Sequence, residues 1–595
     1  MSTVVHQPGT AAAPVRVGTL EELQQRGCVV ISGGRHGIAV FWHEGKVYAV
    51  DNRCPHMGFP LNRGSLKEGI LTCHWHHARF DLESGGTFDP FADDVTVYRT
   101  TIRDGEVWVT PQADGRDREA RWLGRLQDGL EQNLSLVTAK SILALQDLDA
   151  APGEPLRIGG VHGTRYRQGG WGPGLTIMTA MANVLDDLSP AHRPLALYHG
   201  LVRVARDTAG QPPRIDLDPL PEVKAPLPRL AQWYREFIQV RHADGAERCL
   251  RSAIAQGASA ADIAAMLGAA ATDHPFLNGG HTLDFTNKAF ELLEHTGWQH
   301  AGEVLPSLVG QTARATRNEE SAAWRYPVDL IAILRPAEEQ LPALLARGGR
   351  NEASWEGFDA TVEALLDDDP AAGTQAVLGA LEQGAAGTAI SQALCYAAAL
   401  RIARFHTSNE FGDWISVLHT FSYCNALDHL LQRAPTPALA RGILAGAMAV
   451  YLDRFLNTPP ERLPDTRSVQ REPEDADTLL DRLLELTNRQ QEVDAAAAVV
   501  YRYLSLGHDA RRLLQTLGYV LLREDAEFHS YQMLEAGLRQ YHRLNATRPD
   551  AARYVLVAVA RYLAGHSPTD RAMTQTYTIA ARLHRGEELY KAPEE

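Results

Sequence analysis

The sequence lacks three features that would each point to a particular class of protein. It has only six cysteines in 595 residues, too few and too scattered for a disulfide-bonded scaffold, so a reducing cytoplasm is the expected compartment. It has no run of about 18 apolar residues, and we therefore expect no transmembrane helix. It also lacks an excess of basic charge. Its formal net charge of −15 argues against a nucleic-acid partner and against docking on an anionic membrane.

Three segments of different composition make up the chain. Residues 1–15 have no periodic pattern and are predicted to be a disordered lead. Residues 16–115 contain short β-branched and aromatic runs separated by Gly, Asp and Asn, which predicts a small all-β domain. Residues 116–595 are rich in Ala, Leu and Arg with helical periodicity, which predicts a large, mainly α-helical domain. The proline-bearing segment 457–477 is a candidate loop that would divide this region into two subdomains.

The segment "NRCPHMGFPLNRGSLKEGILTCHWHHARFD", residues 52–81, concentrates metal-ligand residue types. Its spacing is Cys54-x-His56, a gap, and then Cys73-x-x-His76. Two thiolates and two imidazoles suit either tetrahedral zinc or an iron–sulfur cluster. A zinc knuckle usually keeps its like ligands together, whereas each loop here supplies one Cys and one His. That division favours a binuclear cluster in which one iron takes both thiolates and the other takes both imidazoles.

This spacing resembles the Rieske 2Fe–2S ferredoxin domain, and the resemblance covers residues 16–111. It implies a cluster held by Cys54, His56, Cys73 and His76, and one-electron transfer as its role. His74 and His77 stand where the family usually has Pro and Gly, so they are set aside as ligands. Phe59 and Trp75 stand where the respiratory branch has a disulfide, so the chain is more similar to the soluble ferredoxin and oxygenase branch.

The region after the cluster motif does not resemble the usual catalytic domain of Rieske oxygenases. That domain is β-rich and holds one iron by two closely spaced histidines and a distant aspartate. The nearest histidine pairs, His192/His199, His274/His281 and His295/His300, lie outside the expected Asn/Asp-x-x-His setting. The sequence of this region also has helical periodicity, and we therefore reject the standard oxygenase subunit.

One polar stripe in the helical region is a candidate second site. His406, Glu410 and Asp413 are spaced i, i+4 and i+7, which places them on one face of a continuous helix. Aromatic neighbours suggest burial, and buried carboxylates and imidazoles need a partner or a metal. His419 would face the opposite side unless the helix breaks near Gly412.

Further histidines offer weaker candidates. His281 lies near the start of a predicted helix, with Asp284 and Lys288 following on its face, and Asp525 and His529 are spaced i, i+4. His199 and His274 fit hydrogen-bonded core residues better than ligands, and Asp525/His529 fits a surface pair equally well. The candidate catalytic residues are His406, Glu410, Asp413 and His529. The candidate ligands of a second metal are His199, His274, His281, His406, Glu410, His419 and His529.

Two stretches, "LALYHGLVRVARD" and "HPFLNGGHTLDFTNKAFELL", are similar in texture to the questin-oxidase-like helical proteins, which are oxygenases acting on aromatic polyketides. The resemblance covers about forty residues of loose motif, and it implies oxygenase chemistry in the helical region.

Together these features predict a two-part oxidoreductase. A reductase or ferredoxin partner would supply electrons, and the cluster would relay them to an oxygen-using mono- or di-iron site acting on a small organic substrate, in a monomer or homo-oligomer. The alternative is an electron carrier or redox sensor whose helices form a partner-binding platform. A third possibility is a cofactor-free oxygenase with His406 and His529 as acid and base.

Overall fold

The computed structural model describes residues 13–34, 36–113, 118–222, 224–317, 320, 327–347, 355–465, 474–587 and 589. The chain divides into two compact units, residues 1–155 with 575–595, and residues 156–574. Most of the predicted lead at 1–15, and residues 466–473 of the predicted loop, lie outside the described residues. Within the described part of the chain, no helix is long and apolar enough to cross a membrane.

The N-terminal part of the first unit is built from two antiparallel sheets. The larger has the strand order β1-β9-β8-β4-β3-β2, and the smaller has the order β5-β6-β7. The helix α1 (Leu20–Arg26) follows the first strand. The strands are β1 (Val15–Thr19), β2 (Cys28–Ile31), β3 (Ile38–His43), β4 (Lys46–Asp51), β5 (Ser65–Lys67), β6 (Ile70–Thr72), β7 (Arg79–Asp81), β8 (Val97–Arg103) and β9 (Glu106–Ala113). The predicted small all-β domain is confirmed.

Strand β3 separates two hydrophobic cores. Successive side chains of a strand point to opposite faces of its sheet. Ile38 and Val40 therefore pack into one core with β9, whereas Ala39 and Phe41 pack into the other. This second core also contains Cys54 and Cys73, so the sheet presents one face to the loops that carry the cluster motif.

The first unit continues beyond the sheets with the helices α2 (Arg118–Glu131) and α3 (Ser135–Asp147) and most of α24 (Ala572–His584). The pair α2–α3 is tied to the loop before β8. Nε of Arg125 donates to Oδ1 of Asp93 over 3.0 Å, and its Nη2 donates to the carbonyl of Ala92 over 3.0 Å. The helical pair is therefore part of the structure around the cysteine loops.

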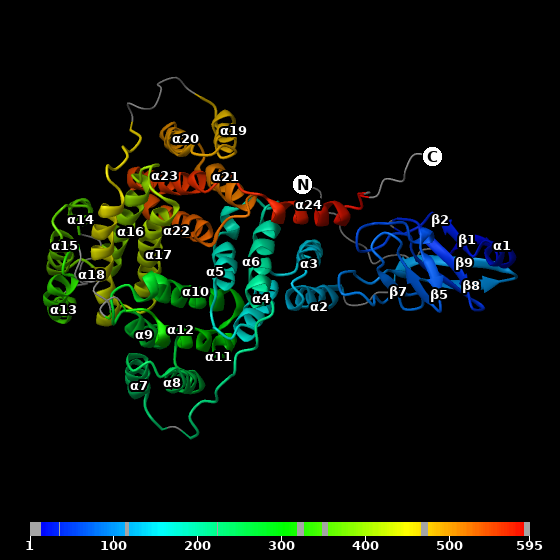
Figure 1. The fold of residues 1–595 in the computed structure, drawn as a ribbon, viewed down its shortest axis with the longest axis horizontal. Helices are drawn as coiled ribbons and strands as arrows, with labels where there is room; N and C mark the ends of the chain where they lie inside the picture. Colours follow the sequence, from blue (N-terminus) through cyan, green and yellow to red (C-terminus); the bar gives the residue numbers. More distant parts are fainter. Residues whose placement is uncertain are drawn as a thin grey trace. The chain divides into compact units, whose positions relative to one another are not determined.

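The second unit is helical, so the predicted fold class, a small β domain followed by a large mainly α-helical region, is confirmed (Figure 1). Its longer helices are α4 (Gly153–Arg165), α5 (Pro173–Asn183), α6 (Arg193–Thr208), α7 (Leu227–Gln239), α8 (Ala243–Ala255), α9 (Ala260–Ala271), α10 (His281–Thr296), α13 (Leu330–Arg347), α14 (Phe358–Leu365), α15 (Ala372–Glu382), α16 (Gly387–Ala403), α17 (Phe411–Arg433), α18 (Pro437–Leu452), α19 (Ala476–Leu486), α20 (Val493–Ser505), α21 (Ala510–Leu522), α22 (Phe528–Asn545) and α23 (Pro549–Gly565). The short helices α11 (Ala301–Val304) and α12 (Val309–Arg314) follow α10.

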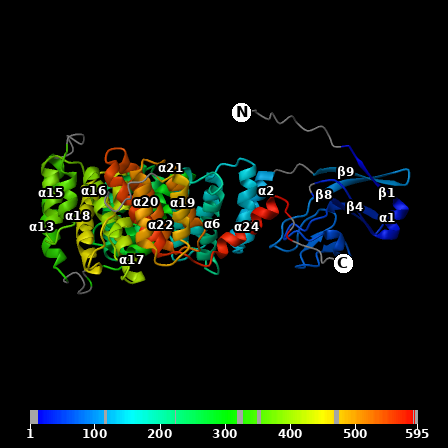
Figure 2. The same cartoon turned by 90° about the horizontal axis from the view of Figure 1, so that it is seen from above.

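Helix α17 lies at the centre of the second unit. It packs on α10, α16, α18 and α22, and both views show it beside α16 and α22 (Figures 1 and 2). Its residues are buried around nearly the whole circumference from Val417 to Leu431, which is the behaviour of a helix without a polar face. A polar side chain on this helix therefore points into protein.

Candidate metal centres

Two loops of the same design carry the cluster motif. In the first, which follows β4, the backbone N–H of Cys54 donates to the carbonyl of Phe59 (2.7 Å) and the N–H of Gly58 donates to the carbonyl of Cys54 (2.8 Å). In the second, which follows β6, the N–H of Cys73 donates to Ala78 (2.8 Å) and that of His77 donates to Cys73 (3.0 Å). Each loop thus folds back on its own cysteine.

The loops bring the four motif side chains together. The two cysteines lie in one buried core, and the rings of His56 and His76 have their centroids 4.9 Å apart. Cys54 and Cys73 are buried, whereas His56 is half-buried and His76 is exposed. The thiols therefore lie on the inner side of the group and one imidazole reaches the surface.

His77 stands where the family usually has glycine. Its backbone has φ +60°, the left-handed conformation that glycine adopts without strain. The second loop keeps this conformation although its residue carries a side chain, and His74 and His77 are both exposed.

The two thiols of the motif differ in acidity. The contact with Cys54 and the backbone N–H groups of Trp75 and His76 lower the pKa of the Cys73 thiol to about 6, and the thiolate is the form that binds metal. The same contact, together with burial, raises the pKa of Cys54. Burial, followed by the charge of Lys140, lowers the pKa of His56 to about 4. Its Nδ1 is buried without a hydrogen-bond partner, as a ligand atom would be. The residues present therefore fit a cluster with two sulfur and two imidazole ligands.

A lysine from the helical pair supports the first loop. Nζ of Lys140, on α3, donates to the carbonyl of His56 over 2.9 Å and lies 3.3 Å from Oδ2 of Asp93. Lys140 and Asp93 are both buried. The positive charge of Lys140, balanced by the carboxylate of Asp93, therefore lies against the first cluster loop.

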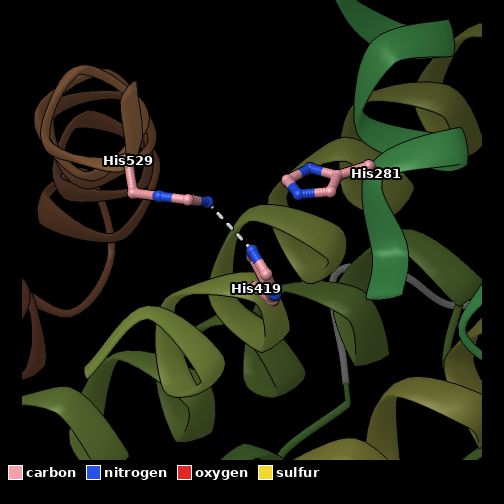
Figure 3. Close-up of side chains that lie close together, drawn as sticks. All are labelled: His281, His419 and His529. Atoms are coloured by element: carbon pink, nitrogen blue, oxygen red, sulfur yellow. Dashed lines mark hydrogen bonds between the residues drawn. The ribbon is translucent and has the colours of Figure 1, made fainter. Parts of the chain in front are cut away.

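A second group of ligand types lies in the helical unit. His281 is the first residue of α10, His419 lies in α17 and His529 lies in α22, and one nitrogen from each ring is within 4.8 Å of the others. The Nε2 atoms of His419 and His529 are 2.9 Å apart. The ring of His281 has its centroid 4.5 Å from that of His419 and 5.8 Å from that of His529, and Figure 3 shows the three rings converging. We call these residues the histidine triad.

A strained turn delivers His281 to the triad. Phe276 and Asn278 have positive φ, as do the following Gly279 (+63°) and Gly280 (+96°). A Cβ on Gly280 would lie 3.3 Å from Cβ of Tyr423 on α17, so a glycine here lets the turn approach α17 closely. Backbone strain of this kind persists where the surrounding structure fixes it, and it clusters at functional sites.

A carboxylate orients His529. Glu527 is the N-cap of α22 and accepts hydrogen bonds from the backbone N–H groups of His529 and Ser530. Its Oε2 also lies 2.8 Å from Nδ1 of His529. Although burial opposes it, these hydrogen bonds hold the pKa of Glu527 below its usual value. Because Nδ1 donates to a carboxylate, Nε2 of a neutral His529 is left as the acceptor, which is the arrangement of metal-bound histidines.

The triad is chemically able to hold a metal. Burial, followed by the neighbouring imidazoles, lowers the pKa of His419 to about 3, and burial with the charge of His529 lowers that of His281 to about 4. Both rings are therefore neutral near pH 7, the form that binds metal. The rings of Phe285 and Phe528 have their centroids 5.2 and 5.8 Å from that of His281, and all three histidines remain partly exposed.

The predicted stripe of His406, Glu410 and Asp413 does not belong to this group. The prediction of one continuous helix is wrong, because α17 begins at Phe411 and Glu410 is its N-cap. Glu410 and Asp413 bond reciprocally to each other's backbone N–H as a capping box. His406 lies in the preceding turn and bonds to Ser408 (2.7 Å). The carboxylates that looked like ligands instead satisfy the free N–H groups of a helix start.

Three further candidates also lie elsewhere. His199 is fully buried with Nδ1 2.7 Å from the hydroxyl of Tyr531, and Nε2 of His274 lies 3.0 Å from Oε1 of Gln239. The predicted i, i+4 helical pair Asp525/His529 is wrong, because α22 begins only at Phe528 and Asp525 accepts from the backbone N–H groups that start α24. All three members of the triad are among the seven candidate ligands of a second metal predicted from the sequence, but the sequence does not single out these three, and Glu527 was not predicted as an orienting residue.

Comparison with known proteins identifies the β domain. Residues 13–99 match the Rieske [2Fe-2S] domain family. A stretch of 96 residues, 16% of this chain, is 31% identical to the 3-phenylpropionate/cinnamic acid dioxygenase ferredoxin subunit of Photorhabdus laumondii subsp. laumondii and covers 90% of it. A stretch of 99 residues is 32% identical to apoptosis-inducing factor 3 of Homo sapiens, but it covers only 16% of either chain.

One solved structure also matches part of this chain. The ferredoxin of carbazole 1,9a-dioxygenase from Nocardioides aromaticivorans IC177 is 28% identical, with a TM-score of 0.16 over 17% of this chain and 100% of its own. The family match ends at residue 99, and nothing in these comparisons identifies the helical region.

Proposed function

Because residues 13–99 belong to the Rieske 2Fe–2S domain family, we propose that the chain is an oxidoreductase that joins an electron-transfer domain to its own acceptor site. A reductase or ferredoxin partner would deliver single electrons to the cluster held by Cys54, His56, Cys73 and His76. The electrons would pass on to a redox-active metal held by the histidine triad, which would use oxygen to act on a small organic substrate.

The histidine triad is the observation that carries this proposal. Three imidazoles from three helices converge within 4.8 Å, and none of them is needed to begin or end a helix by hydrogen bonding. Imidazole ligands suit iron, copper, zinc and nickel, and accepting an electron restricts the choice to iron or copper. Such a metal, when bound, supplies one-electron and oxygen chemistry.

The surrounding residues would prepare the site for a metal. Glu527 fixes the ring orientation of His529 and keeps its Nε2 free to bind. The glycine turn holds His281 against α17, and Phe285 and Phe528 give the site an aromatic wall beside His281. Three protein ligands leave further coordination positions open, as a catalytic metal site requires.

Metal analysis of the full chain tests this proposal. We expect the two cluster irons plus about one further iron or copper per chain. The double variant His281→Ala/His419→Ala should lose only the further metal, whereas Cys54→Ser should lose only the cluster, as seen by EPR of the dithionite-reduced protein. His274→Ala, which alters a histidine outside the triad, serves as the matched control.

Kinetics provide the second readout. The reduced cluster should be reoxidised by oxygen faster in the wild-type chain than in the triad variant, because the triad metal is the proposed acceptor. A wild-type chain that holds only the two cluster irons, with reoxidation unchanged in the triad variant, would contradict the proposal. That result would favour the electron carrier or redox sensor with a helical platform for partner proteins.

A further inference from the structure

A cavity adjoins the histidine triad through one of its members. It has a volume of about 200 Å³ and lies between the turn before α10, helix α17 and the end of α18. Its lining includes Phe276, Gly280, His419, Tyr423, Leu452 and Asp453. His419 is therefore shared between the triad and the cavity.

The size of the cavity limits the compound that fits. A protein cavity of about 150 Å³ lined by apolar side chains accommodates benzene, so the 200 Å³ measured here suits one six-membered ring with a small substituent. Phe276, Tyr423 and Leu452 provide aromatic and aliphatic walls for such a ring. The shape and lining thus favour a compact apolar body.

One polar group in the wall is incompletely satisfied. Asp453 is only 6% exposed, and its Oδ1 accepts a hydrogen bond from Oγ1 of Thr420 over 3.2 Å. Its Oδ2 is buried and has no hydrogen-bond partner. A buried polar atom without a partner destabilises the folded protein. A ligand group that bonded to Oδ2 would relieve this cost once the carboxyl group turned that atom, which has almost no exposed surface, toward the cavity.

The protonation state of Asp453 indicates which ligand group that would be. Burial raises the pKa of Asp453 well above its usual range, which favours the neutral form of its carboxyl group. Arg401 opposes this shift, but its Nε is engaged with the carbonyl of Val450 over 2.9 Å. A neutral carboxyl group both donates and accepts, so it matches a hydroxyl or carbonyl group and does not favour an ammonium ion.

We infer that this cavity binds a small uncharged ring compound with one hydroxyl or carbonyl group, hydrogen bonded to Asp453 and lying beside His419. That the compound is also the substrate of the triad rests on the proposed function. Its binding rests only on the cavity and on Asp453.

Calorimetric titration of the full chain with phenol, toluene and benzylamine at pH 7 tests the inference. We expect phenol to bind about tenfold more tightly than toluene, because only phenol bonds to Asp453. Asp453→Leu should remove that difference, whereas Asp453→Asn should keep most of it because an amide also donates and accepts. Asp481→Asn changes an exposed carboxylate on α19 and should leave all three affinities unchanged.

Several results would overturn the inference. These are no binding of phenol by the wild-type chain, equal phenol affinity in the wild type and Asp453→Leu, or tighter binding of the benzylammonium ion than of phenol. Unchanged toluene affinity in Asp453→Leu would show that this variant is folded. The titration needs neither metal nor turnover, and phenol should still bind to His281→Ala/His419→Asn, so a failure of the proposed function is distinguishable from a failure of the cavity.

Discussion

The Nε2 atoms of His419 and His529 lie 2.9 Å apart although 110 residues separate them in the sequence. Nδ1 of His529 faces Glu527, so His419 donates the shared hydrogen bond and His529 accepts it. A metal bound by both rings would lie to one side of the line between the two nitrogens, because metal–imidazole bonds of about 2 Å are longer than half of this separation. The pairing therefore gives Glu527 a measurable role.

Glu527→Gln should weaken metal binding at the triad by about 10- to 100-fold, the usual effect of removing a carboxylate behind a histidine ligand. Competition with a chelator measures this affinity. Asp475→Asn changes the N-cap of α19 and is the matched control for a lost capping charge. Equal metal affinities in the two variants would show that Glu527 acts only as a helix cap.

Lys140→Met should lower the midpoint potential of the cluster by roughly tens of millivolts, because a buried positive charge stabilises the more negative reduced state. Redox titration followed by EPR measures the change. Lys67→Met removes a lysine whose side chain is 85% exposed and should leave the potential in place. A shift of the same size in both variants would assign it to net charge and not to the contact with the His56 loop.

Glu410→Ala should destabilise the helical unit by about 1 kcal/mol through loss of a helix cap and leave the metal content unchanged. Urea unfolding followed by circular dichroism measures the stability, and elemental analysis measures the metal. Loss of a metal equivalent in this variant would restore Glu410 as a ligand and contradict the capping role.

Asp284 should make the helical unit less stable as the pH rises from about 4 to 7. Burial raises its pKa in the folded state to about 7, so in this window the unfolded chain binds fewer protons than the folded one and stability falls. The loss is on the order of 4 kcal/mol. Asp284→Asn keeps a hydrogen-bonding partner for Gln532, which donates to Asp284 over 2.6 Å, and should remove this part of the pH dependence.

Urea unfolding at pH 5, 6 and 7.5 measures this effect as the difference between wild-type and variant slopes. Asp481→Asn, which changes an exposed carboxylate, should unfold with the wild-type pH dependence. Parallel slopes for the wild type and Asp284→Asn would contradict the raised pKa.

The cluster site was predictable because its ligands are local in sequence. Cys54 and His56 share one loop, Cys73 and His76 share another, and the spacing alone distinguishes this division from a zinc knuckle. Strand β3, which is buried on both faces from Ile38 to Phe41, was likewise visible as a short β-branched and aromatic run. In both cases neighbouring residues carry the information.

The histidine triad was not predictable as a group, because its members come from three helices whose packing the sequence does not state. Helical periodicity placed His419 on the face opposite His406, but it could not show that α17 begins at Phe411. The signal that would have corrected this is Glu410 followed three residues later by Asp413, the spacing of a capping box. Likewise, the sequence marks neither Asp453, which only its burial distinguishes, nor Glu527, which its contact with His529 distinguishes.

Because Lys140 donates to the carbonyl of His56, the smallest fragment that can transfer electrons should be longer than the two β-sheets alone. A fragment ending after β9 would keep all four ligand residues, yet it would lose both Lys140 and Arg125, the two cations that hold Asp93 and the first cluster loop. Water would then reach the inner side of that loop. We therefore expect the smallest fragment that keeps the first cluster loop in place to extend through α3. The cluster depends on helices that lie outside the two β-sheets.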